Sequence, residues 1–227
     1  MNQIPERLTM VRERIRRAAT ACGRDPGDVT LLAVSKTKPL ADVIAAYEAG
    51  QRLFGENYLQ DALPKILGMP ASDVEWHFIG RIQGNKTAEI SRHFSWVHGL
   101  DRVHHAEQLS RYRPAGMADL QVCLQVNLSA EASKGGVAAD QLPALARAVA
   151  DLPRLRLRGL MTMPDPHATN DALHAAFSRL RHLRDRLNAE GSALDTLSMG
   201  MSGDLETAIA EGATIVRIGT DIFGARD

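Results

Sequence analysis

Hydrophobic residues recur at helical spacing at the start of the chain. The apolar face of this segment is formed by Ile4, Leu8, Val11, Ile15 and Ala18. Residues spaced by three and four positions share one face of a helix, so the pattern predicts an amphipathic helix. The predicted helix ends near the turn sequence CGRDPGD, residues 22–28.

Short apolar runs, each followed by a polar or glycine-containing turn, alternate with helical patterns through the rest of the chain. The predicted strands are 30–35 (TLLAVS), 52–56 (RLFGE), 74–80 (VEWHFIG), 94–100 (FSWVHGL), 120–127 (LQVCLQVN), 155–162 (LRLRGLMT), 194–200 (LDTLSMG) and 214–220 (TIVRIGT). Segments 129–136 and 164–171 are the longest predicted loops. The chain therefore contains about eight strand–helix units.

Strands that alternate with helices pair in parallel through right-handed crossovers. About eight such units in one chain of this length favour a closed (β/α)₈ barrel, the TIM-type fold, preceded by the N-terminal helix. An open doubly wound sheet is the alternative. No repeat, low-complexity tract or linker divides the sequence, so we expect a single domain over residues 1–227.

Composition and charge exclude several classes of protein. Lys plus Arg and Asp plus Glu each total 27, which argues against a nucleic-acid binder. The charged N-terminus lacks the apolar core of a signal peptide or membrane anchor, so we expect a cytoplasmic protein. Cys22 and Cys123 have no metal-ligand spacing, and we assign the chain no metal site.

Barrels bind ligands at the carboxyl ends of their strands, and several unusual residues fall at predicted strand ends. Lys36 follows the first strand, Asn57 the second, and His77 lies near the end of the third; Arg217 belongs to the eighth. Structural roles are open to some of them, since His77 can be a core histidine and Asn57 a helix cap. Their common location nevertheless indicates a ligand site.

Lys36 has particular chemical potential. A lysine ammonium is costly to place beside buried apolar residues, and desolvation there favours the neutral, nucleophilic amine. Such an amine forms a Schiff base with a carbonyl ligand. The alternative is a lysine that extends its charge to solvent, which is the interpretation we give Lys38.

The segment 197–224, LSMGMSGDLETAIAEGATIVRIGTDIFG, supplies glycine-rich turns after the last two strands. Backbone N–H groups there, together with Ser198, Ser202 and Thr220, can hold a phosphate near the start of a short helix. A strand-end lysine and a phosphate site together indicate an aldehyde phosphate. Pyridoxal 5′-phosphate (PLP) is the commonest such cofactor.

Six segments in order resemble the signature segments of the pyridoxal phosphate homeostasis proteins. They are VSKTKP, FGENYLQ, WHFIGRIQGNK, QVNLSAEASKGG, RGLMTM and the segment 197–224. This resemblance covers nearly the whole chain. It implies the barrel of the alanine racemase N-terminal domain and a role in PLP homeostasis and in amino-acid and keto-acid balance.

The resemblance also implies residue roles. Lys36 would hold PLP as an internal aldimine, while Ser198, Gly219 and Thr220 would bind the phosphate. Arg217 would face the pyridine nitrogen. A guanidinium cannot accept the proton of that nitrogen, so the ring would stay neutral and withdraw electrons less strongly than beside a carboxylate.

Two functions remain open from the sequence. The first is a monomeric carrier that buffers PLP and delivers it to apo PLP-dependent enzymes. The second is an enzyme with weak or narrow activity such as amino-acid racemisation, which requires a base on each face of the cofactor. We expect no second base, because the chain ends at Asp227, just past the eighth strand. Lys134, in the loop after the fifth strand, is a candidate for assisting cofactor transfer.

Overall fold

The computed structural model describes residues 3–128, 135–165 and 167–225. Its strands are β1 (Thr30–Val34), β2 (Leu53–Glu56), β3 (Glu75–Phe78), β4 (Trp96–Leu100), β5 (Leu120–Gln125), β6 (Leu155–Met161), β7 (Thr196–Ser198) and β8 (Ile215–Ile218). Each pairs in parallel with the next, and β8 pairs with β1 to close the barrel. The predicted (β/α)₈ barrel is confirmed.

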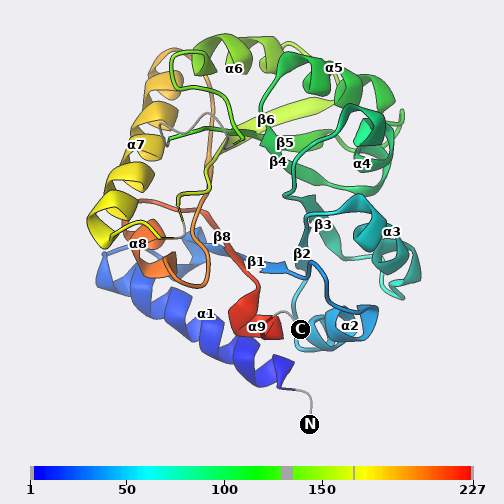
Figure 1. Cartoon of the computed structure of the whole chain (residues 1–227), viewed down its shortest axis with the longest axis vertical. Coiled ribbons are helices and arrows are strands. Elements are labelled where there is room, and N and C mark those ends of the chain that lie inside the picture. Colours follow the sequence, from blue (N-terminus) through cyan, green and yellow to red (C-terminus); the bar gives the residue numbers. More distant parts are fainter. Residues whose placement is uncertain (1–2, 129–134, 166, 226–227) are drawn as a thin grey trace.

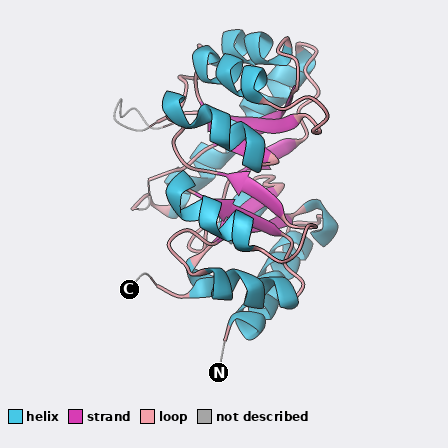
Figure 2. Cartoon of the chain, turned by 90° about the vertical axis from the view of Figure 1, so that its right-hand side faces the viewer, coloured by secondary structure: helices cyan, strands magenta, loops and turns pink. Residues whose placement is uncertain are grey.

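Helices surround this barrel on the outside (Figures 1 and 2). The α-helices are α1 (Ile4–Ala21), α2 (Leu40–Glu48), α3 (Leu59–Gly68), α4 (Thr87–His93), α5 (Val103–Tyr112), α6 (Leu142–Ala150), α7 (Asn170–Ala189), α8 (Leu205–Ala210) and α9 (Thr220–Phe223). The described residues also form the 3₁₀ turns η1 (Pro26–Asp28) and η2 (Gly84–Lys86). In the described part of the chain, no helix combines the length and apolarity needed to cross a bilayer.

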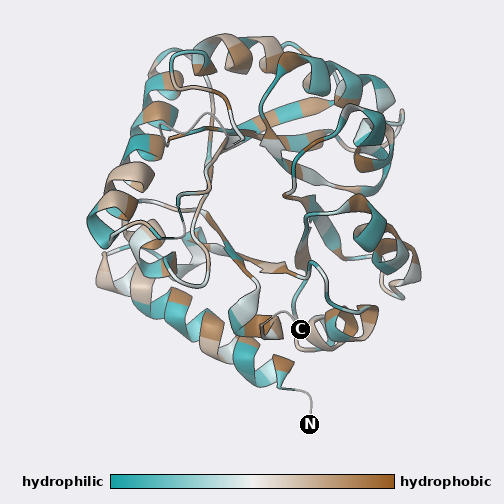
Figure 3. Ribbon diagram, viewed as in Figure 1, coloured by the Kyte–Doolittle hydropathy of each residue, from teal (hydrophilic) through white to brown (hydrophobic). Residues whose placement is uncertain are grey.

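Helix α1 is the predicted N-terminal helix, and it packs beside α8 and α9 (Figure 1). Its buried face contains Ile4, Leu8, Val11, Ile15 and Ala19. Ala19 therefore takes the buried position that the sequence pattern gave to Ala18. Polar and apolar residues alternate along α1 in the hydropathy view (Figure 3), as expected of a helix with one face on the core.

Residues of each strand alternate between the helix-facing layer and the barrel interior, because successive side chains of a strand point to opposite faces. The helix-facing layer holds most of the apolar core. A smaller cluster belongs to the interior and consists of Leu32, Val34, Ile79, Trp96, Cys123, Met161 and Ile215. The same alternation places His77, His98 and Arg217 inside the barrel, two residues after Glu75, Trp96 and Ile215.

Candidate functional site

A cavity of about 300 Å³ opens at the carboxyl ends of the strands. It is lined by Val34, Lys36, Lys38, Asn57, Ile79, Met163, Met201, Ser202, Gly203, Arg217, Gly219, Thr220, Phe223 and Gly224. We call it the mouth cavity. Six of the predicted site residues meet there: Lys36, Asn57, Ser202, Arg217, Gly219 and Thr220.

Lys36 is half-buried in the turn that follows β1. Ser35 continues the pairing beyond the strand, since its N–H donates to Gly55 O at 3.1 Å, and Lys38 N donates back to Ser35 O at 3.1 Å. Thr37 completes the turn with a φ of 64°, in the left-handed region that few residues other than glycine adopt. This tight turn directs the chain from the strand to α2 and sets Lys36 at the wall of the mouth cavity.

A buried ion pair lies behind this turn. Lys65 Nζ donates to Glu56 Oε1 at 2.5 Å and to Ser35 O at 2.8 Å, and the Ser35 hydroxyl donates to the same Glu56 oxygen at 2.6 Å. Burial raises the pKa of Glu56, although the charge and hydrogen bond of Lys65 oppose that shift. The pair ties α3 to the ends of β1 and β2, so the backbone beside Lys36 has a rigid support.

The opposite wall of the mouth cavity consists of backbone turns. Gly219 precedes α9, and a Cβ there would lie 3.1 Å from Val34 O, so the chain passes close to β1. Gly200, with a φ of 95°, turns the chain after β7 and accepts a hydrogen bond from Arg217 N at 2.9 Å. These turns bring Ser202 and Thr220 together, although 18 positions separate them in the sequence.

Arg217 forms part of the cavity floor and is buried at 4% exposure. Its guanidinium donates to Ser198 O at 2.6 Å, to Ser198 Oγ at 2.8 Å and to Thr162 O at 2.9 Å, all neutral oxygens. Burial lowers the pKa of Arg217 to about 10, and the negative charge of Asp204 acts in the opposite direction. Arg217 therefore stays protonated at neutral pH, fixed by carbonyl and hydroxyl acceptors.

Asn57 follows β2 and borders the mouth cavity. Its Oδ1 is buried and has no hydrogen-bond partner among the described residues. A Cβ at Gly80 would lie 2.0 Å from Asn57 O, so only glycine allows the β3 end to approach this turn. The side chain of Asn57 does not cap α3. Its amide oxygen Oδ1 can therefore accept a hydrogen bond from a ligand hydroxyl.

Two predicted residues, His77 and Ser198, lie deeper than the sequence indicated. Both are fully buried, and neither lines the mouth cavity. His77 instead borders a second cavity of about 630 Å³ at the amino ends of the strands. Ser198 is bonded to His98 and Arg217. A direct cofactor contact by either residue stays a prediction.

The sequence analysis missed the positions of Lys38 and His98, and one predicted residue lies outside the described part of the chain. Lys38, which we interpreted as a solvent-directed lysine, lines the mouth cavity and donates to Ala225 O at 2.7 Å. The alternation of residues in β4 was the available signal for His98, because it shares a face with Trp96. Lys134, the predicted transfer residue, lies outside the described residues.

The ionisable side chains on the described lining of the mouth cavity are all basic. Among the described residues that line it, the ionisable side chains are Lys36, Lys38 and Arg217, and none is a carboxylate. Positive groups with backbone turns and hydroxyls form a site for an anionic ligand. The volume lies at the lower end of the range of about 300–1,000 Å³ typical of small-molecule pockets.

Comparisons with known proteins agree with this geometry. The family model described as alanine racemase, N-terminal domain, matches residues 7–227. A protein of Pseudomonas aeruginosa named pyridoxal phosphate homeostasis protein is 60% identical over all of this chain and 97% of its own length. A protein of Escherichia coli with the same name is 48% identical over all of this chain and 98% of its own length.

Solved structures give the same result. PipY of Synechococcus elongatus with PLP bound has a TM-score of 0.86 and 36% identity, covering 98% of this chain and all of its own. An alanine racemase of Corynebacterium glutamicum shares the fold, with a TM-score of 0.68 and 17% identity; this chain covers 62% of its length. The chain belongs to the pyridoxal phosphate homeostasis protein family, whose barrel is that of the alanine racemase N-terminal domain.

Proposed function

We propose that this protein binds PLP in the mouth cavity and contributes to PLP homeostasis. The observation that carries the proposal is the meeting of Lys36, Arg217 and the Ser202–Thr220 turns around one small cavity without a lining carboxylate among the described residues. The names of the relatives and the PLP-bound PipY structure support it.

Lys36 would hold PLP covalently, as a Schiff base between its neutral side-chain amine and the aldehyde of the cofactor, with loss of one water molecule. PLP held in this way would supply an imine carbon that exchanges reversibly with other amines. Lys65 is unsuited to this role because its ammonium is engaged with Glu56 at the far side of the turn.

The remaining contacts follow from the chemistry of the wall and floor. Ser202, Gly219 and Thr220 would hold the phosphate, with backbone N–H groups and hydroxyls as donors. Arg217 would face the pyridine nitrogen and donate to it, because a guanidinium has no acceptor. Asn57 Oδ1, which has no partner in the described part of the chain, would accept a hydrogen bond from a hydroxyl on the ring.

We favour a PLP-binding protein over an enzyme. Racemisation needs a proton donor on each face of the cofactor. Lys36, Lys38 and Arg217 are the ionisable side chains on the described lining of the mouth cavity, and Arg217 stays protonated. Lys38 is the candidate for a second base on this lining, and its Nζ is held by a hydrogen bond to Ala225 O at 2.7 Å. We therefore expect racemisation to be absent or weak.

The protein would act as a monomer of one domain, residues 1–227, in the cytoplasm, and would release PLP to apo PLP-dependent enzymes. Through those enzymes it would influence amino-acid and keto-acid balance. Lys134 would assist the release step.

Lys36→Ala tests the proposal, with Lys38→Ala as the lysine control, since Lys38 lines the same cavity. Borohydride reduction followed by peptide mapping should find the pyridoxyl group on Lys36 of the unmodified protein, and Lys36→Ala should lose visible absorbance while it remains folded by circular dichroism. A pyridoxyl group found mainly on Lys38 or Lys65 would refute the assignment. Steady turnover of an amino acid would favour the enzyme alternative.

A further inference from the structure

A line of hydrogen bonds crosses the barrel interior from the amino end to the floor of the mouth cavity. Glu75 Oε1 lies 2.9 Å from His77 Nε2, and His77 Nδ1 lies 2.9 Å from His98 Nε2. His98 Nδ1 lies 2.7 Å from Ser198 Oγ, which accepts from Arg217 Nη1 at 2.8 Å. The five residues come from β3, β4, β7 and β8. We call this line the interior relay.

The Glu75 end of the interior relay fixes the direction of its hydrogen bonds when both imidazoles are neutral. A carboxylate only accepts, so His77 carries its proton on Nε2 and donates it to Glu75, which leaves His77 Nδ1 as an acceptor. His98 must then carry its proton on Nε2 and donate it to His77 Nδ1. The free Nδ1 of His98 accepts from the Ser198 hydroxyl, whose oxygen in turn accepts from Arg217.

The charges of the interior groups agree with this direction. Burial lowers the pKa of His98 well below its ordinary value, and the neighbouring His77 and Arg217 act the same way. Burial also lowers the pKa of His77, although Glu75 opposes the shift. The hydrogen bond from His77 lowers the pKa of Glu75. Both imidazoles are therefore neutral and Glu75 is ionised at neutral pH.

Packing holds the relay in one geometry. The ring of His77 stacks on Trp96 with centroids 5.3 Å apart and planes within 4°. His77 and His98 are fully buried, whereas the Glu75 side chain is 43% exposed at the cavity of the amino end. Aligned hydrogen bonds polarise one another, so a change at the carboxylate is transmitted along the line.

We propose that Glu75, His77, His98 and Ser198 are positioning residues, which orient the Arg217 guanidinium toward the pyridine nitrogen of PLP through a one-way relay that ends at the opposite mouth of the barrel. The cofactor part of this inference rests on the proposed function. The direction of the hydrogen bonds in the relay concerns only residues of this chain. The inference places Ser198 beneath the cofactor, beside Arg217, instead of at the phosphate.

Nitrogen-15 spectra of the histidine side chains test the direction in PLP-free protein at neutral pH. We expect His77 and His98 both to be protonated at Nε2 and unprotonated at Nδ1. A proton on Nδ1 of either ring, or a charged imidazole, would overturn the relay. This measurement needs no variant, so it holds even if a substituted chain fails to fold.

Variants at Glu75 test whether a change at this carboxylate is transmitted along the relay to His98. Glu75→Ala removes the terminal acceptor of the relay. The nitrogen signals of His98 should therefore change, although Glu75 makes no hydrogen bond to His98. PLP should bind about three- to tenfold more weakly, and its visible absorption band should shift. Glu75→Gln keeps an acceptor oxygen and should restore the wild-type tautomers and spectrum. A merely structural Glu75 would lower stability without moving the His98 signals or the PLP band.

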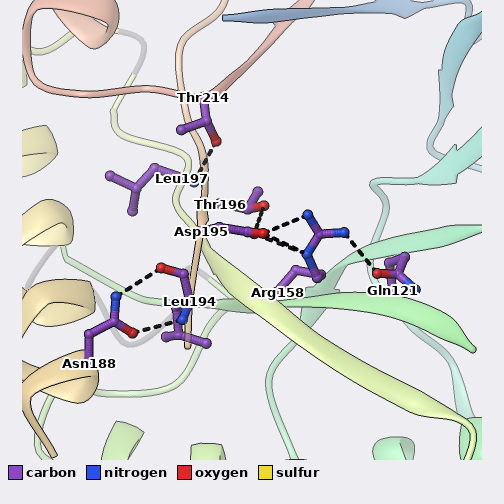
Figure 4. A network of polar contacts seen from close by, with 8 residues as sticks. All are labelled: Gln121, Arg158, Asn188, Leu194, Asp195, Thr196, Leu197 and Thr214. Carbon is purple, nitrogen blue, oxygen red and sulfur yellow. Dashed lines mark hydrogen bonds and ion pairs between the residues drawn. The ribbon is translucent and has the colours of Figure 1, made fainter. Parts of the chain in front are cut away.

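Asp28→Ala is the matched control, because Asp28 also lines the cavity at the amino end and is exposed. Asp195 lines the same cavity but is unsuited, since it pairs with Arg158 (Figure 4), whose guanidinium lies 5.0 Å from the centre of the Trp96 ring that stacks on His77. Asp28→Ala should leave the His98 signals and PLP binding unchanged. Unchanged His98 signals in Glu75→Ala would show that a change at Glu75 does not reach His98. This result would not count against the proposal that the protein binds PLP. If the wild-type protein failed to bind PLP, the proposed function and the cofactor part would both fall, and the nitrogen spectra would still decide the direction.

Discussion

Arg14 of α1 donates a hydrogen bond from Nη2 to the carbonyl oxygen of Ser202 at 3.2 Å, across 188 positions of the sequence. The same guanidinium pairs with Glu206 at the start of α8 and with Asp221 in α9. The N-terminal helix therefore braces both turns of the proposed phosphate site from outside. This contact gives α1 a function beyond covering the barrel.

Arg14→Ala should weaken PLP binding by about fivefold, because the Ser202 turn loses its brace, and should lower the free energy of unfolding by about 1 kcal/mol, as these ion pairs are partly exposed. Titration calorimetry and urea unfolding measure the two effects. Arg17→Ala is the control, since Arg17 is 75% exposed and pairs with Glu13 on its own helix. Equal PLP affinity in Arg14→Ala would show that α1 does not support the site.

Ser202→Ala and Thr220→Val should each weaken PLP binding by about 1–3 kcal/mol, the usual worth of a hydrogen bond to a charged group. Inorganic phosphate, used as a competitor, should lose affinity for the same variants. Ser198→Ala should weaken PLP but leave phosphate affinity unchanged, because Ser198 contacts Arg217 and does not line the mouth cavity. Loss of phosphate affinity in Ser198→Ala would return Ser198 to the phosphate site.

Removing one partner of the Glu56–Lys65 pair should destabilise the protein by about 3–5 kcal/mol, since the side chains are 0% and 6% exposed and the remaining charge would stay buried. The double variant Glu56→Gln, Lys65→Met should be much less destabilised, because it leaves no unpaired charge. Chemical denaturation of the three variants measures this double-mutant cycle. A double variant as unstable as the sum of the single variants would contradict the pairing.

Folding stability should fall as pH decreases below 6.5, the ordinary pKa of histidine. The folded-state pKa values of His77 and His98 are lowered, so the unfolded chain binds protons that the folded chain does not. The stability that they contribute is complete above 6.5 and is lost below it, by up to about 1.4 kcal/mol per pH unit for each histidine.

Urea unfolding at several pH values measures this slope. His105 acts in the same direction, and Glu75 contributes a further loss only below its ordinary value of 4.5. His98→Gln should reduce the slope between pH 6.5 and about 5. A slope unaffected by that substitution would mean that His98 is charged in the folded protein.

The sequence by itself determined the order of elements and the fold. Apolar residues recur at one spacing in helices and at another in strands, because each spacing follows from the local backbone geometry, and tertiary packing preserves that geometry in this chain. The face of α1 was predictable from spacing, with an error of one position at Ala18. The predicted first strand reached Ser35, one residue beyond β1, because Ser35 keeps one hydrogen bond to Gly55 after the strand ends. The place of Lys36 at the mouth cavity was predictable because it directly follows that strand, and its contact with the cofactor stays a prediction.

The tertiary structure decided which polar residues meet. His77 and Ser198 were predicted at the mouth because both belong to the ends of apolar runs, but their depth depends on how the strands are staggered around the closed barrel. The register also shifts between Val97 and Leu100, beside His98. A period of two gives the face of a residue in its own strand and not its height relative to other strands. Barrel closure sets that height, and with it the contact of His98 with Ser198 and of Ser198 with Arg217.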